Sequence, residues 1–320
     1  MFAAMMTNYS QIPRSKQQLE WDAERMFNSG GRFTHLHTPA LETDMVFHTR
    51  EEYYVAIAYM AMAAAEARVE VLAYALMSNH FHFILRGKDT RKFFNLFLRR
   101  LCLYLSRHGR PGILNTMRAE ETEISSLKQF RNEVAYVIRN PFVVKDSVHI
   151  FANIQTSGFL YFNPFLQFLS VEAIDNMTIR EKQAIIKSKD TELLKGATAL
   201  GPMINPASFV NYKLVESLFV TARQFIHWTL KNVEVQVETA LRMGEQPNLS
   251  DEELLSVTFK LCRSQFGIAK PAELDRQQQM ILVKKLKYDY SASNGQIARV
   301  LNAPVSTIDA MFPLSAKERK

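Results

Sequence analysis

Two histidines stand one residue apart in an apolar run that reads as a strand. The run is Met77-Ser78-Asn79-His80-Phe81-His82-Phe83-Ile84-Leu85. Side chains alternate between the two faces of a strand, so His80 and His82 share one face and the phenylalanines share the other. Paired imidazoles can bind one metal ion or one phosphate group. Two surface histidines that only make hydrogen bonds would show the same spacing, so the pair alone does not decide between these interpretations.

A second pair with the same spacing occurs earlier, in Thr34-His35-Leu36-His37-Thr38. Its flanks are polar and Pro39 ends the run. We therefore do not expect His35 and His37 to belong to the site.

A later segment, residues 126–142, combines a core-facing stripe with a tyrosine on the other side. Consecutive helical residues are about 100° apart, and the stripe consists of Leu127, Phe130, Val134 and Val137. Tyr136 falls roughly opposite that stripe, together with Gln129, Asn132 and Asn140. This position favours use of the tyrosine hydroxyl over burial of the ring. An amphipathic surface tyrosine would also fit.

The elements expected to position these side chains alternate along residues 32–140. Hydrophobic periodicity predicts strands at 32–38, 44–48, 69–77 and 80–85, helices at 51–67, 90–107 and 126–139, and a loop at 108–125. The last helix should stop at Asn140-Pro141, because proline disfavours helical geometry in the residue before it. Connections of hairpin length indicate an α+β fold, an antiparallel sheet with helices on one face.

The predicted domains are a leader (1–30), the α+β domain (31–150), a helical extension and connection (151–205), and an all-helical C-terminal domain (206–320). The leader ends at Ser29-Gly30-Gly31, and glycines and prolines between 188 and 206 interrupt the helical pattern. The tail NGQIARVLNAPVSTIDAMF is typical of a helix-turn-helix, with Ile297, Ala298 and Leu301 inward and Ser306 as a cap. Small helical domains without a DNA role share that pattern.

The charge composition indicates which kind of molecule the protein binds. The 320-residue chain is 47% hydrophobic, and 39 Lys and Arg against 32 Asp and Glu give a net charge of +7. This balance favours a polyanion such as nucleic acid. Cys102 and Cys262 lack the spacing of a disulfide framework or a zinc site. With no signal peptide or bilayer-spanning segment in the sequence, we expect a soluble, cytoplasmic protein with no membrane partner.

Taken together, the two chemistry-bearing segments resemble the HUH single-tyrosine transposases, most closely the REP-associated tyrosine transposases. That family carries approximately Met-Pro-Asn-His-hydrophobe-His on a strand and Tyr-Ile-x-x-Asn-Pro on a helix. Here the motifs are Met77-Ser78-Asn79-His80-Phe81-His82 and Tyr136-Val137-Ile138-Arg139-Asn140-Pro141. Ser78 replaces the usual proline, which shapes a turn. The resemblance spans roughly residues 32–150.

The resemblance implies a ferredoxin/RRM-like HUH nuclease sandwich that cleaves and rejoins single-stranded or hairpin DNA in transposition. It assigns His80 and His82 to a divalent metal, Mg or Mn, Tyr136 to nucleophilic attack, and Asn140 to a third metal ligand. A phenol with a pKa of about 10 is a weak nucleophile at neutral pH, so a cation at the phosphate is chemically reasonable. The product would be a 5′-phosphotyrosine, and the sequence contains no ATP-binding phosphate loop.

Backbone contacts to DNA are expected from basic side chains near the site, namely Arg86, Lys88, Arg99, Arg100, Arg131 and Arg139. The alternative function is a domesticated, non-cleaving DNA-binding protein. An RNA-binding protein would need aromatic residues on the open sheet face, where this sequence has imidazoles. The sequence leaves open whether Tyr136 acts in its own subunit or in the partner's site of a homodimer.

Overall fold

The structure, a computed structural model, describes residues 15–39, 45–143, 153–231, 233–244, 247 and 249–313. Its centre is a four-stranded antiparallel sheet in the order β2-β3-β1-β4. The strands are β1 (Phe33–His37), β2 (Glu70–Leu76), β3 (Phe81–Arg86) and β4 (Glu120–Ile124). In the β1–β3 pair, His37 lies opposite His82. The strand order makes β1 and β3 neighbours, and this register brings their two histidine pairs side by side.

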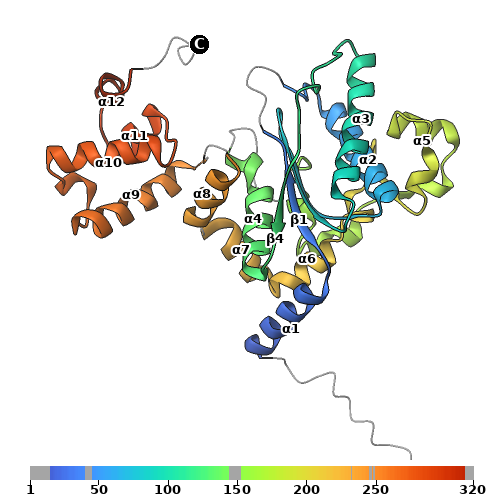
Figure 1. The fold of residues 1–320 in the computed structure, drawn as a ribbon, viewed down its shortest axis with the longest axis horizontal. Helices are drawn as coiled ribbons and strands as arrows, with labels where there is room; N and C mark the ends of the chain where they lie inside the picture. The colour runs from blue at the N-terminus through green and yellow to red at the C-terminus, as the bar shows by residue number, and fades with distance from the viewer. Residues whose placement is uncertain are drawn as a thin grey trace, which may run out of the picture.

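Helices α2 (Arg50–Ala67) and α3 (Thr90–Arg107) cover one face of the sheet (Figure 1). A capping box between Thr49 and Glu52 begins α2. The phenylalanines of β3 point to this side, where the Phe83 ring centre lies 5.2 Å from that of Phe93. The alternation of β3 therefore turns its other side chains, His82 among them, to the opposite face.

That opposite face is covered by α4 (Leu127–Val143), whose predicted stripe of Leu127, Phe130, Val134 and Val137 packs with Phe33 and Ile84. Three further helices complete this side: α1 (Lys16–Ser29), α6 (Tyr212–Phe219) and α7 (Ala222–Lys231). Next to α4 lies α8 (Val233–Arg242), which contributes Ala240 to this core.

The α+β class, the antiparallel sheet and the helical C-terminal region are confirmed. Helices lie on both faces rather than on one, because α4 and α1, joined by α6 and α7, pack on the face opposite α2 and α3.

Residues 153–211 carry short elements. They include α5 (Ile179–Ile186) and a small antiparallel sheet of β5 (Glu172–Ala173), β6 (Thr198–Leu200) and β7 (Met203–Ile204). Short 3-10 helices lie at Ser157–Leu160, Pro164–Phe168, Ile174–Asn176, Thr191–Leu194 and Pro206–Ser208. The predicted connection at 188–206 thus holds two strands. The domain boundaries at 30, 150 and 205 stay predictions.

Four helices form a separate C-terminal cluster, drawn at the left of Figure 1. They are α9 (Asp251–Phe266), α10 (Arg276–Tyr288), α11 (Asn294–Leu301) and α12 (Val305–Met311), with a further 3-10 turn at Pro271–Glu273. Ile297 and Ala298 are buried as predicted. The expected cap at Ser306 is wrong: α12 begins one residue earlier, after Pro304, and has no side-chain cap.

Three local expectations differ from the structure. Residues 45–48 form no strand, and Asp44 lies outside the described residues. Residues 120–124, expected as loop, form β4 at the edge of the sheet. Helix α4 continues through Asn140-Pro141 to Val143, because a proline close to a helix end removes only one hydrogen bond. Among the described residues no helix is both long and apolar enough to cross a membrane.

Candidate functional site

His80 and His82 enter the site from the start of β3. His82 is fully buried, His80 is partly exposed just before the strand, and their ring centres are 5.0 Å apart. The Nδ1 atom of His80 lies 2.8 Å from Oδ1 of Asn79. Since a carbonyl oxygen only accepts, Nδ1 of His80 donates, and the neutral imidazole keeps its lone pair on Nε2.

The histidine pair on β1 belongs to the same cluster, so the expectation that it lies outside the site is wrong. Nε2 of His35 is 3.2 Å from Nδ1 of His82. The ring of His37 stacks on that of His82 with centres 6.0 Å apart. Both β1 side chains are buried. Antiparallel pairing of β1 with β3 brings the two His-x-His pairs together on one face of the sheet.

Helix α4 supplies the other polar groups, Glu133, Tyr136 and Asn140, at helical spacings of three and four. Nδ2 of Asn140 lies 3.0 Å from Nε2 of His82. The ring of Tyr136 meets that of His82 edge to face, with centres 5.6 Å apart. The continuation of α4 beyond Pro141 keeps Asn140 in the helix, one turn after Tyr136.

Burial keeps the imidazoles neutral. It is the main reason why the pKa values of His80 and His37 fall to about 4, and the neighbouring histidines lower both further. Burial also places the pKa of His82 well below its ordinary value. Neutral imidazoles are the form that can coordinate a metal ion.

A buried carboxylate completes the cluster. Oε2 of Glu133 is 2.7 Å from Nδ1 of His35, and Arg242 of α8 forms an ion pair with Oε1. Burial alone would raise the pKa of Glu133, but the hydrogen bond from His35 and the positive charge of Arg242 bring it below its ordinary value. Glu133 is therefore ionised at neutral pH.

The metal-binding set implied by the resemblance fits these side chains. Two imidazoles on one ion, at metal–nitrogen distances of about 2.1 Å, have ring centres roughly 5 Å apart, as His80 and His82 do. In the structure Nδ2 of Asn140 donates to Nε2 of His82 at 3.0 Å. Rotation of the amide would bring Oδ1, the atom that can bind a metal, to the same place, and two ligand atoms at right angles on one ion lie about 3 Å apart. The described residues offer no group of three His, Cys, Asp or Glu side chains that could hold a metal. The set implied by the resemblance would be two imidazoles and an amide oxygen, with the other positions taken by water and phosphate oxygens.

Tyr136 lies beneath α8, and the expectation that its ring stays out of the core is wrong. The residue is 5% exposed, belongs to the same hydrophobic core as Val134 and Val137, and borders a small pocket. The pocket is lined by Tyr136, Arg139, Asn140, Gln236, Val237, Ala240, Pro247 and Leu249.

Only one of the six basic residues predicted to contact DNA, Arg139, lies at this pocket. It is 3% exposed and forms a buried ion pair with Glu253 of α9. Arg131 is also buried and contacts Glu20 at 2.8 Å. Arg86 pairs with Glu70 at 2.5 Å, at the far end of β3 from His80.

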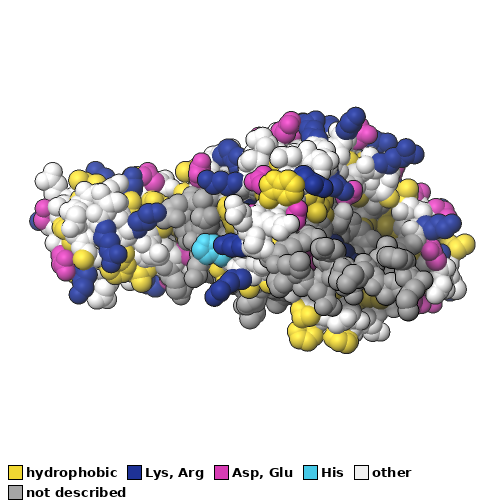
Figure 2. Space-filling view, turned by 90° about the horizontal axis from the view of Figure 1, so that it is seen from below, with side chains coloured by type: hydrophobic (Ala, Val, Ile, Leu, Met, Phe, Trp, Pro, Cys, Tyr) yellow, Lys and Arg dark blue, Asp and Glu magenta, His cyan; other side chains and the backbone are white. Residues whose placement is uncertain are grey.

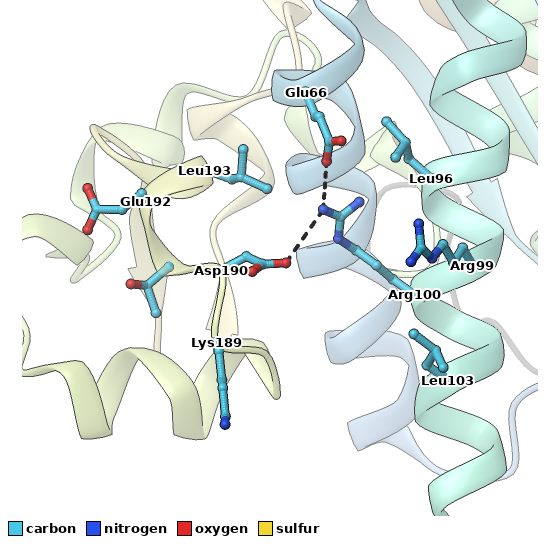
Figure 3. A pocket seen from close by; sticks show the side chains of 10 residues that line it. Glu66, Leu96, Arg99, Arg100, Leu103, Lys189, Asp190, Glu192 and Leu193 are labelled. Atoms are coloured by element: carbon cyan, nitrogen blue, oxygen red, sulfur yellow. Dashed lines mark hydrogen bonds and ion pairs between the residues drawn. The ribbon is translucent and has the colours of Figure 1, made fainter.

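Arg99 and Arg100 lie on α3, over the sheet face opposite the histidines. They line a groove of about 650 Å³, and Figure 3 shows Arg100 held between Glu66 and Asp190. Lys88 is exposed in the β3–α3 loop. On the face drawn in Figure 2, Lys and Arg are spread out with Asp and Glu among them. DNA contact by these six residues stays a prediction.

Sequence reasoning missed His35 and Glu133. His35 repeats the His-x-His spacing of β3, which was a usable signal. Glu133 lies three residues before Tyr136 and therefore near its face of the helix. Neither signal predicts that His35 contacts His82 and Glu133, because those contacts depend on the strand register and on the position of α4.

Comparison with solved structures finds one described as "Structure of the REP associates tyrosine transposase bound to a REP hairpin". The match has 14% sequence identity and a TM-score of 0.34, and it covers 41% of this chain and 78% of that chain. A likeness of this size does not place the chain in a family. No protein-family model and no curated protein matches the chain.

Proposed function

We propose that this protein is a metal-dependent endonuclease or transposase that cleaves and rejoins single-stranded or hairpin DNA through Tyr136. One observation supports the proposal: the ring of His82 is contacted by His80 from the start of β3 and by two side chains of α4, Asn140 and Tyr136. An isolated surface His-x-His pair would not need a helix amide and a phenol against its rings.

In the proposed reaction, Oη of Tyr136 attacks a DNA phosphorus atom. The phenol loses its proton, the bond from phosphorus to the 3′-oxygen breaks, and that oxygen leaves as a 3′-hydroxyl. The product is a phosphodiester between Tyr136 and the 5′ end. Because this bond replaces the one that was cleaved, a second 3′-hydroxyl can reverse the reaction without ATP.

His80, His82 and Asn140 would hold a divalent ion, Mg or Mn. When bound, the ion supplies Lewis-acid stabilisation of charge at the phosphate and the leaving oxygen. Imidazole ligands suit Mn better than Mg, while water and phosphate oxygens suit both. The side chains of this protein then orient the phosphate against Tyr136 and exclude water from the buried part of the site.

The test is covalent capture. Protein and end-labelled single-stranded DNA carrying hairpins are incubated with Mn²⁺ and run on a denaturing gel. The expected result is a protein–DNA adduct that disappears in Tyr136→Phe and in His82→Ala. An adduct that persists in Tyr136→Phe assigns the nucleophile elsewhere, and wild type without an adduct on any hairpin substrate removes the nuclease proposal.

The second candidate is a non-cleaving DNA-binding protein. One observation favours it: Tyr136 is 5% exposed beneath α8, so a DNA phosphate cannot reach it in this conformation. Titration with hairpin DNA separates the two candidates. Tight binding that is indifferent to Mn²⁺, without an adduct, supports the second candidate, whereas Mn²⁺-dependent adduct formation excludes it.

A further inference from the structure

The metal-binding face of His82 is set by a chain of buried hydrogen bonds that runs away from the site. Nδ1 of His82 lies 3.2 Å from Nε2 of His35, and Nδ1 of His35 lies 2.7 Å from Oε2 of Glu133. The side chains of His35 and Glu133 are 0% exposed. Three elements, β3, β1 and α4, therefore meet through these contacts.

The chemistry of the groups gives this chain one direction. The Glu133 carboxylate only accepts hydrogen bonds, so Nδ1 of His35 donates to it. At the other end of the chain, the amide Nδ2 of Asn140 only donates, so Nε2 of His82 accepts and carries no proton. Nδ1 of His82 then carries the proton that it donates to His35. The lone pair of His82 is left on Nε2, the atom that faces Asn140.

We propose that His35 and Glu133 are positioning residues, which hold His82 in the tautomer and orientation that present its Nε2 lone pair to the divalent ion. This inference rests on the proposed function for the identity of the site. Neither residue touches the ion or DNA. A histidine ligand whose second nitrogen donates to a fixed acceptor is more basic and better oriented, and losing such a partner weakens metal binding about 10-fold to 100-fold.

Arg242 extends the arrangement to the C-terminal half of the chain. It forms an ion pair with Oε1 of Glu133, while His35 uses Oε2. Its side chain is 41% exposed. The charge of Arg242 favours the ionised carboxylate that the chain of hydrogen bonds requires.

The experiment measures the tautomer and the metal affinity separately, in Tyr136→Phe protein so that no DNA chemistry intervenes. Two-bond ¹H–¹⁵N spectra of histidine-labelled protein report which ring nitrogen of His82 carries the proton. Electron paramagnetic resonance of free Mn²⁺ gives the affinity. We expect the Nδ1–H tautomer of His82 in the parent, and Mn²⁺ binding weakened about 10-fold or more in Glu133→Gln, whose neutral amide is a weaker acceptor for His35 than the carboxylate. Thermal unfolding is recorded for every variant.

Glu120→Gln is the matched control, because it removes a carboxylate 3.7 Å from His37 rather than one bonded to His35. It should leave Mn²⁺ affinity within about twofold. If Glu133→Gln does not fold, Arg242→Ala replaces it, with binding weakened on the order of threefold, as for a half-exposed ion pair. Wild-type affinity in the folded variant, or a His82 ring that carries its proton on Nε2 in the parent, overturns the proposal.

The outcomes also separate this inference from the proposed function. Mn²⁺ binding that depends on Glu133, with no DNA adduct from wild type, supports the positioning role and removes the nuclease. A wild-type adduct, with Glu133→Gln equal to the parent in affinity, supports the nuclease and removes the positioning role.

Discussion

The candidate site is built largely from histidine side chains that are buried and uncharged. His37, His80 and His82 have pKa values below the ordinary histidine value, chiefly because burial disfavours the charged ring. Their neutrality makes them available to a metal ion, and it also ties the stability of the metal-free fold to pH.

The first prediction concerns that dependence. The folded-state pKa of His37 is about 4, below the ordinary 6.5, so the unfolded chain binds more protons between these values. Stability should therefore be full above pH 6.5 and should fall as pH drops towards 4, by up to about 1.4 kcal/mol per pH unit for each such histidine. The groups facing His37 are His35, His80, His82, Glu120 and Glu133, and the backbone of Met243 forms a hydrogen bond to its ring.

Urea unfolding of metal-free protein at several pH values checks this. His37→Gln removes one titrating group, so its stability should change less between pH 6.5 and 4 than that of wild type. Parallel pH profiles for the two proteins would contradict the buried, neutral assignment of His37.

Some residues of the candidate site could be predicted from the sequence and others could not. Alternation along a strand predicted that His82 lies on the face opposite the phenylalanines. Helical periodicity predicted that Tyr136 and Asn140 share one side of α4, but it could not show that α8 covers Tyr136 and buries its ring. The role of His35 could not be predicted, because its contact with His82 depends on the pairing of β1 with β3. A shift of one residue would turn His35 to the other face.

Helix α4 connects the sheet, the site and the C-terminal helices. One face packs with Phe33 and Ile84, another presents Tyr136 and Asn140, and Arg139 reaches Glu253 at the start of α9. The ion pair is almost fully buried, with side chains 4% and 14% exposed. Removing one partner of such a pair leaves the other charge buried without a counter-charge, which destabilises the fold.

The second prediction follows from that pair. Glu253→Gln leaves the Arg139 charge buried without a counter-charge and should lower the free energy of unfolding by about 3 kcal/mol. The matched control is Asp251→Asn on the same helix, whose partner Arg299 is 59% exposed. That change should cost much less, because water already screens this exposed pair. Equal losses in urea unfolding would show that the Arg139–Glu253 pair is not buried.

Most elements were predictable where the sequence pattern was strong, as in the long apolar run of α2 and the helical periodicity of α3. The exceptions have local causes. Strand β4 has the sequence Glu-Glu-Thr-Glu-Ile, too polar for a strand pattern, and it forms because an edge strand needs only one partner and faces water. Helix α4 continues past its predicted end because a proline close to a helix end removes only one backbone hydrogen bond.

At the scale of the whole molecule there are separate hydrophobic cores. The clusters around the sheet draw on α1 to α8, whereas Leu254, Leu282 and Ile297 belong to a cluster of the C-terminal helices. Both tryptophans of the chain, Trp21 and Trp228, lie on the sheet side, on α1 and α7. Their fluorescence therefore reports on that part alone.

The third prediction uses this asymmetry. Leu282→Ala empties a fully buried position in α10 and should destabilise the C-terminal cluster by about 2–5 kcal/mol. Helix loss by circular dichroism should begin at lower urea than in wild type, while the tryptophan transition stays in place. Val134→Ala, on the face of α4 that packs on the sheet, should instead shift the tryptophan transition to lower urea. If Leu282→Ala shifts both signals together, the two parts unfold as one unit.

The most direct test of the central claim is to identify the residue that carries DNA. Wild-type protein is reacted with hairpin-containing single-stranded DNA and Mn²⁺, digested with nuclease and protease, and the modified peptide is sequenced by mass spectrometry. The account predicts a nucleotide attached through its 5′ phosphate to Tyr136, and none when His80 and His82 are both alanine. A nucleotide on any other residue, or the same yield without the two histidines, would contradict it.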